Sequence, residues 1–134
     1  MHIANFDQLL QAARQQPDAQ RLLLVFAGAS LPEQATPEQR AAFAAGQGGE
    51  LTPLMCVDKT PDELGSFAAL CDEAARMGQD WVIVFVAGLS GRGTQAPSTQ
   101  DAEPHLQRMV EAIKAGQLGQ CIPFNTEGNA VNLR

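Results

Sequence analysis

The stretch VFVAGLSGRG, residues 84 to 93, is the first candidate for chemistry, because an apolar run ends there in a glycine-rich loop. Such loops cradle phosphate groups when a lysine follows the glycines and a helix begins at once. Here no lysine follows, and Gly88, Gly91 and Gly93 reverse the spacing of the dinucleotide-binding fingerprint. We therefore interpret the loop as the exit from a buried strand. An anion site with Arg92 as its cation is the alternative.

The second candidate is CVDKTPDE, residues 56 to 63, at the end of one predicted strand and just before a helix. Open α/β sheets often bind ligands at such strand ends. Asp58 and Lys59 are expected to be exposed there, and with Arg92 they form the candidate ligand-binding set. No sequence motif places a base beside Cys56, so we expect this thiol to point into the core.

The remaining nucleophiles and ligands form no recognisable set. Cys56, Cys71 and Cys121 are far apart and have apolar neighbours, as expected for reduced core thiols. His2 and His105 have no ligand-type residue at a helical interval, so we predict no metal site. His105 could act as a general base only beside a nucleophile, and no motif supplies one, so we interpret it as a helix-surface residue. We predict no catalytic residue and no cofactor.

Composition limits the class of partner. The chain has 134 residues and a net charge of −6, without a cluster of lysine or arginine. This balance argues against nucleic acid, because cationic side chains supply most of that affinity, and against anionic membranes. The apolar runs are too short to span a bilayer, and the first residues lack a targeting pattern. We expect one soluble, acidic, cytoplasmic domain over residues 1–134.

Caps and apolar periodicity predict four helices. The first begins at Asn5, and Thr-Pro caps begin the second and third at residues 36 and 60. The fourth begins near Asp101, with Pro104 in its first turn. Two helices carry clear apolar stripes, which consist of Leu64, Phe67, Cys71 and Ala74 in the third and Leu106, Met109, Val110 and Ile113 in the fourth.

Two unbroken apolar runs, residues 21–28 and 81–88, are predicted to be central strands covered on both faces. Two further strands, 51–57 and 121–125, contain a proline and therefore belong at the edges. A turn at residues 126–129 leads to a short last strand, 130–133. The class is α/β, with helices packed on a four- to five-stranded sheet.

The order helix, strand, helix, strand occurs twice, in candidate repeat halves 5–58 and 60–133. AGQGGELTPL in the first half corresponds to AGQLGQCIPF in the second. With the four main strands numbered along the chain, we predict the order 2-1-3-4. Each half would contain a parallel pair joined by a crossover, and the central pair would be antiparallel, which makes a mixed sheet. The second helix is short, so an antiparallel arm is the alternative in the first half.

In this model of the halves, the loops AGASLPEQ and GLSGRG leave the sheet at opposite ends, too far apart to form one shared site. The matched positions are Val25, Ala45 and Pro53 in the first half, and Val84, Ala115 and Pro123 in the second.

The runs FDQLLQAARQQP, LTPLMCVDKTPDEL and DWVIVFVAGLSG resemble a family of small proteobacterial proteins over nearly the whole chain. Some members of that family carry the label ribonucleotide reductase alpha subunit. That enzyme requires a far larger barrel, a cysteine pair and a radical cysteine, none of which this sequence offers. The resemblance implies a single bacterial domain and supplies no site residue.

Two functions from different classes follow. A non-catalytic interaction or regulatory module with a protein partner fits the duplicated architecture and the acidic composition. The alternative is a small enzyme or a metabolite- or anion-binding protein that uses the loops after the central strands, with Arg92, Lys59 and Asp58 as its polar groups. We favour the first function, and therefore a protein that is not an enzyme.

Overall fold

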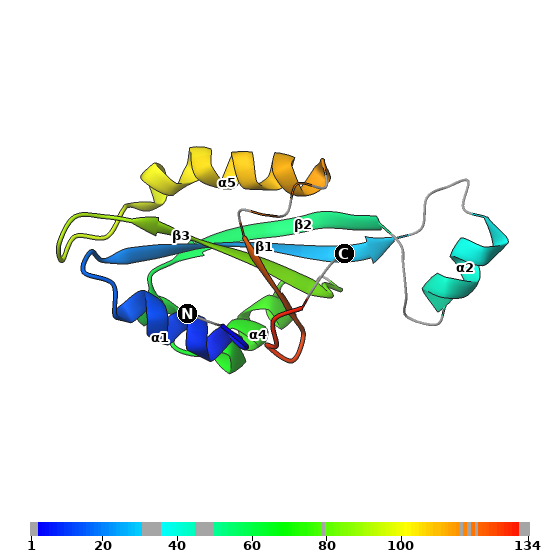
Figure 1. The fold of residues 1–134 in the computed structure, drawn as a ribbon, viewed down its shortest axis with the longest axis horizontal. Helices are drawn as coiled ribbons and strands as arrows, with labels where there is room; N and C mark the ends of the chain where they lie inside the picture. Colours follow the sequence, from blue (N-terminus) through cyan, green and yellow to red (C-terminus); the bar gives the residue numbers. More distant parts are fainter. Residues whose placement is uncertain are drawn as a thin grey trace.

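The two unbroken apolar runs form the centre of a four-stranded sheet in the computed structural model, which describes residues 3–30, 36–44, 50–78, 80–115, 117, 119 and 121–131. Along the chain the elements are α1 (Phe6–Arg14), β1 (Gln20–Ser30), α2 (Pro37–Ala44), β2 (Glu50–Lys59), α3 (Pro61–Leu64), α4 (Phe67–Arg76), β3 (Ile83–Ser90), α5 (Thr99–Lys114) and β4 (Ile122–Asn125). The predicted α/β class, with helices packed on the sheet, is confirmed (Figure 1).

The strand order is β2-β1-β3-β4, as predicted, and both proline-containing strands lie at the edges. Neighbouring strands are antiparallel throughout, so the predicted central pair is confirmed and the predicted parallel pair in each half is wrong. Ser90 pairs with Gln20, the first residue of β1, so β1 and β3 end at opposite ends of the sheet. This agrees with the prediction that the loops AGASLPEQ and GLSGRG leave the sheet at opposite ends. Residues 31–34 of the first loop lie outside the described residues.

In the first half, α2 does not return over the sheet. It lies beyond the end of β1 and β2 (Figure 1), and residues 37–41 are exposed. A crossover needs a helix that packs on the sheet while the chain returns, and α2 has no apolar stripe to do so. The two strands therefore form a long antiparallel arm, which is the alternative that the short second helix had indicated.

In the second half, α5 does return over the sheet, yet β4 still runs against β3. It begins opposite Val86 and ends opposite Ile83. Phe124 of β4 is fully buried and contacts the ring of Phe6 in α1, with ring centroids 5.4 Å apart. The backbone of residues 129–131 bonds back to β4, at the place predicted for the last strand. Residues 132 and 133 of that prediction lie outside the described residues.

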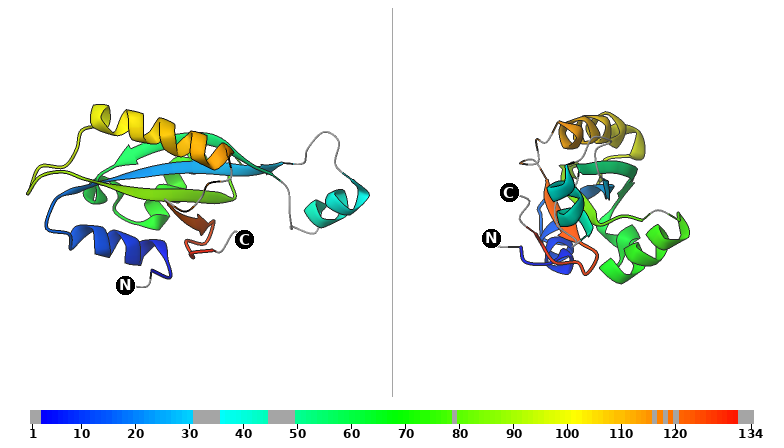
Figure 2. Two further views of the ribbon diagram at one scale, coloured as in Figure 1. Left: turned by 45° about the horizontal axis from the view of Figure 1, so that its top comes forward. Right: turned by 90° about the vertical axis from the view of Figure 1, so that its right-hand side faces the viewer.

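The sheet is covered on both faces, as the unbroken apolar runs predicted. Figure 2 shows α5 on one side of the sheet, with α1 and α4 on the other. Alternate residues of β1 therefore enter different cores. Leu22, Leu24 and Phe26 pack with α1, α3 and α4. Leu23, Val25 and Ala27 pack under α5.

Two helix boundaries differ from the prediction. The third helix is interrupted after one turn, because Gly65 adopts a φ of 74° and Ser66 caps a new helix, α4. Leu70 is buried in α4, while Cys71 from the predicted stripe is only half-buried. The fourth helix begins at Thr99, where Ser98 and Asp101 form a capping box, so Pro104 lies in its second turn.

The matched positions of the two candidate halves fall in corresponding elements where they are described. Val25 lies in β1 and Val84 in β3, while Pro53 lies in β2 and Pro123 in β4. Ala115 caps α5, and its counterpart at position 45 lies outside the described residues. The halves differ in where α2 and α5 lie, and the duplication stays a prediction.

Candidate functional site

Asp58, one of the three predicted ligand-binding residues, is held in an ion pair at the end of β2. Its carboxylate lies 2.8 Å from the Arg21 guanidinium and accepts a hydrogen bond from the Thr99 hydroxyl, also at 2.8 Å. Both charged side chains are only 13% exposed. Arg21 also donates to the carbonyl of Pro97. The pair therefore joins β1, β2 and the start of α5. Asp58 is largely buried in this pair, so its expected exposure is wrong.

Lys59, the second predicted residue, lies next to Asp58 but on the other face of the sheet. Its ammonium group lies 2.9 Å from the Glu73 carboxylate in α4. Successive residues of a strand point to opposite faces, so Asp58 and Lys59 cannot contact the same small ligand. The structure does not bring the predicted set of Asp58, Lys59 and Arg92 together.

The glycine-rich loop uses its amides within the protein. The amide of Gly91 donates to Ala19 and that of Arg92 donates to Gln95, at 2.8 and 2.9 Å. The amide of Gly93 donates to the Asp18 carboxylate at 2.8 Å. A phosphate cradle needs such amides to be available to the ligand. The loop is instead a tight turn attached to the start of β1, in agreement with its interpretation as a strand exit.

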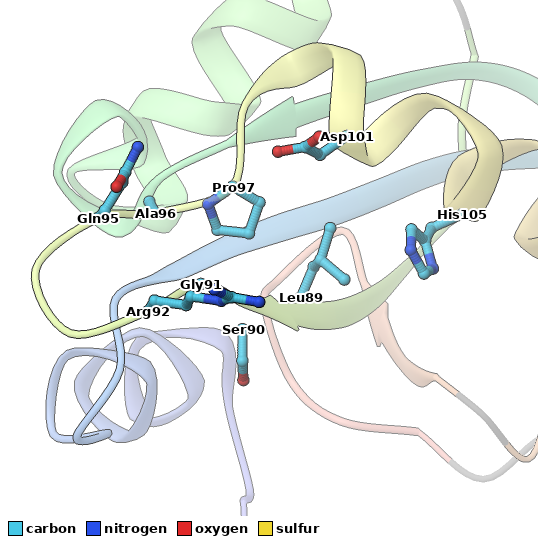
Figure 3. Close-up of a pocket in the computed structure, with 9 residues that line it drawn as sticks. All are labelled: Leu89, Ser90, Gly91, Arg92, Gln95, Ala96, Pro97, Asp101 and His105. Carbon is cyan, nitrogen blue, oxygen red and sulfur yellow. The ribbon is translucent and has the colours of Figure 1, made fainter.

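Arg92, the third predicted residue, lines a hollow of about 450 Å³ between the end of β3 and the start of α5. Asp101 and His105 line it from α5, and Ser90 points away from it (Figure 3). The Asp101 carboxylate accepts a hydrogen bond from the Ser98 amide as part of the helix cap. The Ser90 hydroxyl accepts from the Gln20 side chain at 2.8 Å. The hollow, which we call the loop pocket, thus contains no paired nucleophile and base among the described residues.

A second hollow of about 370 Å³ adjoins the loop pocket and shares Leu89 and His105 with it. We call it the α5–β3 groove. Its apolar floor is formed by Leu23, Ala87, Leu89 and Met109. Its polar rim is formed by His105 and Arg108. The Arg108 guanidinium lies 2.8 Å from Nδ1 of His105. Since a guanidinium only donates, that nitrogen accepts, and His105 orients Arg108 at the rim.

The backbone beside this groove is open. β4 pairs with β3 only from Ile83 to Val86, and Cys121, which is bonded to the first residue of β4, takes the next place along its line, so the outer side of Gly88–Ser90 has no neighbouring strand among the described residues. Gly91 donates to Ala19 and therefore faces β1. Strand residues alternate in the side to which their N–H and C=O groups point, so those of Gly88 and Ser90 face the open edge.

Cys56 is exposed, so its predicted place in the core is wrong. It lies on the edge strand β2, where it lines a hollow together with Leu106 and Val110 of α5. Cys71 and Cys121 are half-buried, and loss of hydration raises the pKa of both thiols. No group of histidine, cysteine, aspartate and glutamate in the described part of the chain could hold a metal ion.

Sequence reasoning missed Arg21 and Arg108. Arg21 opens an apolar run and resembled a strand boundary, and only the fold brings Asp58 to it. Arg108 follows His105 by three residues, a helical spacing that could have indicated a shared face. The position of β3 beside that face depends on tertiary structure.

No protein-family model, curated protein or solved structure matches the chain. Within the described residues, no helix combines the length and apolar character that crossing a membrane requires.

Proposed function

We propose that the protein is a non-catalytic interaction module that binds a segment of a partner protein at the α5–β3 groove. The observation that carries this proposal is the open edge of β3, where the backbone groups of Gly88 and Ser90 have no partner among the described residues. Exposed strand edges pair readily with other chains, and many binding domains use them in this way. The apolar floor of the groove adds a place for a side chain of the bound segment.

The surroundings of the groove support binding rather than catalysis. In the adjoining loop pocket the polar side chains have structural roles, because Asp101 caps α5 and Ser90 bonds Gln20. His105 accepts from Arg108, and the Cys121 thiol, which also lines the groove, has a pKa raised by burial, which disfavours the reactive thiolate. The proposal also includes a cytoplasmic location and no nucleic-acid partner, the latter supported by the net charge of −6.

A matched pair of variants at Ser90 tests the proposal. Proline at this position removes an N–H that faces outward, so no bond to β1 is lost, while strand addition is blocked. Alanine keeps the N–H. Both substitutions remove the hydroxyl that bonds Gln20, so this loss is common to both. The tagged full chain would be crosslinked to partners in its native host and purified.

We expect a partner to be recovered with the wild type and with Ser90→Ala, and to be lost with Ser90→Pro. Urea denaturation of both variants checks that the fold is intact. Equal recovery with Ser90→Pro, or no recovered partner with any form, would contradict the proposed module.

A metabolite- or anion-binding function is the second candidate. It is supported by Arg92 and Arg108, which line adjoining hollows without a described carboxylate in ion-pair contact. A thermal-shift screen with nucleotides, sugar phosphates and carboxylates tests it. A ligand present at a hundred times its Kd would stabilise the fold by about 2.7 kcal/mol. A stabilisation that Arg92→Ala removes would favour this candidate over the interaction module.

A further inference from the structure

We propose that the segment bound at β3 is extended and acidic, and that it continues the line of β4 as an added strand. This inference rests on the proposed function and names the chemistry of its partner. It depends on three features of the groove: its backbone edge, its floor and its charge.

The backbone features favour β3 over the other edge of the sheet. β2 also has an outer edge, but Pro53 interrupts its donors and Leu54 forms a bulge, since Phe26 pairs with Met55 and Ala27 with Pro53. Proline and bulges are the features by which proteins prevent strand addition. The open stretch Gly88–Ser90 contains neither a proline nor a charged residue. An added strand would therefore find its backbone partners at Gly88 and Ser90.

The side chains of an added strand would alternate between the two faces of the sheet. The side chain opposite Leu89 would point toward α5, because Leu89 itself does. It would meet the floor of the α5–β3 groove, which has room for an aliphatic side chain. The bound segment therefore needs an apolar residue on this face.

The charge of the rim selects an acidic segment. The protein as a whole carries a net charge of −6, yet Arg92 and Arg108 both line this region and form no ion pair with described residues. Asp101 is the one described carboxylate that lines either hollow, and it is used in the cap of α5. The hollow on the other side of α5 is lined instead by Glu103 and Glu111. An acidic segment would be repelled there and attracted at the β3 side.

Synthetic peptides blocked at both ends test this chemistry by fluorescence anisotropy with the full chain. The probe is a seven-residue peptide in which pairs of valines alternate with pairs of glutamates, so that each face of the extended peptide carries both types. Matched peptides carry glutamine or lysine in place of glutamate. We expect the glutamate peptide to bind most tightly and the lysine peptide most weakly.

The variants separate charge from backbone pairing. Arg108→Ala is expected to weaken binding of the glutamate peptide about two- to fivefold, the range for an exposed ion pair. Arg76→Ala is the control, because Arg76 is an exposed cation of α4 on the other face of the sheet, without a described ion pair. Added salt should weaken binding of the glutamate peptide. Ser90→Pro should abolish binding, and Ser90→Ala should not.

Each contrary outcome has a distinct meaning. If the glutamine or lysine peptide binds as tightly as the glutamate peptide and Ser90→Pro abolishes this binding, the acidic partner is wrong and the interaction module stands. The same holds if no peptide binds but the cellular partner is still lost with Ser90→Pro. If Ser90→Pro leaves binding of the glutamate peptide unchanged, strand addition is wrong. A dimer in sedimentation that Ser90→Pro dissociates would make a second copy of this chain the occupant and overturn the inference.

Discussion

Asp58 offers the sharpest test of whether a predicted ligand-binding residue is structural. Replacement by alanine removes a carboxylate that contacts both Arg21 and Thr99 at 2.8 Å. Loss of one partner from a buried ion pair costs about 3–5 kcal/mol. Here the pair keeps 13% exposure and Arg21 has a second carboxylate, Glu63, at 3.6 Å, so part of the cost is relieved. We expect Asp58→Ala to lower the free energy of unfolding by about 2–3 kcal/mol.

Urea denaturation followed by circular dichroism measures this effect. With an m value of about 2 kcal/mol/M, the midpoint should fall by about 1 M or more. Thr99→Val is the control, because it removes only the hydroxyl bond and should cost about 1 kcal/mol. In a double-mutant cycle, Asp58→Ala and Arg21→Ala together should cost about 1–2 kcal/mol less than the sum of the single changes. A cost below about 0.5 kcal/mol for Asp58→Ala, combined with loss of partner recovery, would refute the structural role and restore Asp58 as a binding residue.

Three further predictions concern the loop, the thiols and the acid stability. Gly91→Ala should destabilise the fold by at least about 2 kcal/mol in urea denaturation, because its Cβ would clash with the backbone oxygen of Gln95. Gly88→Ala should change little, since only the flexible end of the Gln20 side chain is near. A thiol reagent should label native Cys56 first and the two half-buried cysteines more slowly, and equal rates for all three would contradict the exposed edge position. Hydrogen bonds from the N-cap threonine, Thr60, lower the pKa of Glu63 below its ordinary value of 4.5. The wild type should therefore be more stable than Glu63→Gln above pH 4.5 and should lose this advantage as the pH falls through the folded pKa. A stability advantage that persists in acid would contradict the role of Glu63 in the cap.

Several features of the fold could be predicted because they depend on residues close together in the chain. Asn5 and Thr60 cap helices where their side chains can reach an amide three residues on. The apolar runs of β1 and β3 indicated cover on both faces, and the prolines of β2 and β4 indicated edges. These signals indicated which strands are central and which lie at the edges. The order 2-1-3-4 depended in addition on the expectation that each half pairs its own two strands, which is confirmed, although these pairs are antiparallel.

Strand direction and the site required tertiary structure. Proline content and apolar character do not encode which way a strand runs. β1 and β2 form an antiparallel arm because α2 lies beyond their end and does not carry the chain back over the sheet. Cys56 has apolar neighbours in sequence, yet it is exposed because β2 lies at the edge of the sheet, which only the fold decides.

The sequence by itself determined the α/β class, the central and edge strands, and the interpretation of GLSGRG as a strand exit. Only the tertiary structure decided that Arg21 pairs with Asp58, that Lys59 faces away from it, and that β4 pairs with β3 only from Ile83 to Val86. The physical reason is the range of the interactions. Caps, turns and burial periods are set within a few residues, whereas an ion pair or an open strand edge depends on elements that are distant in the chain and meet only when the core packs.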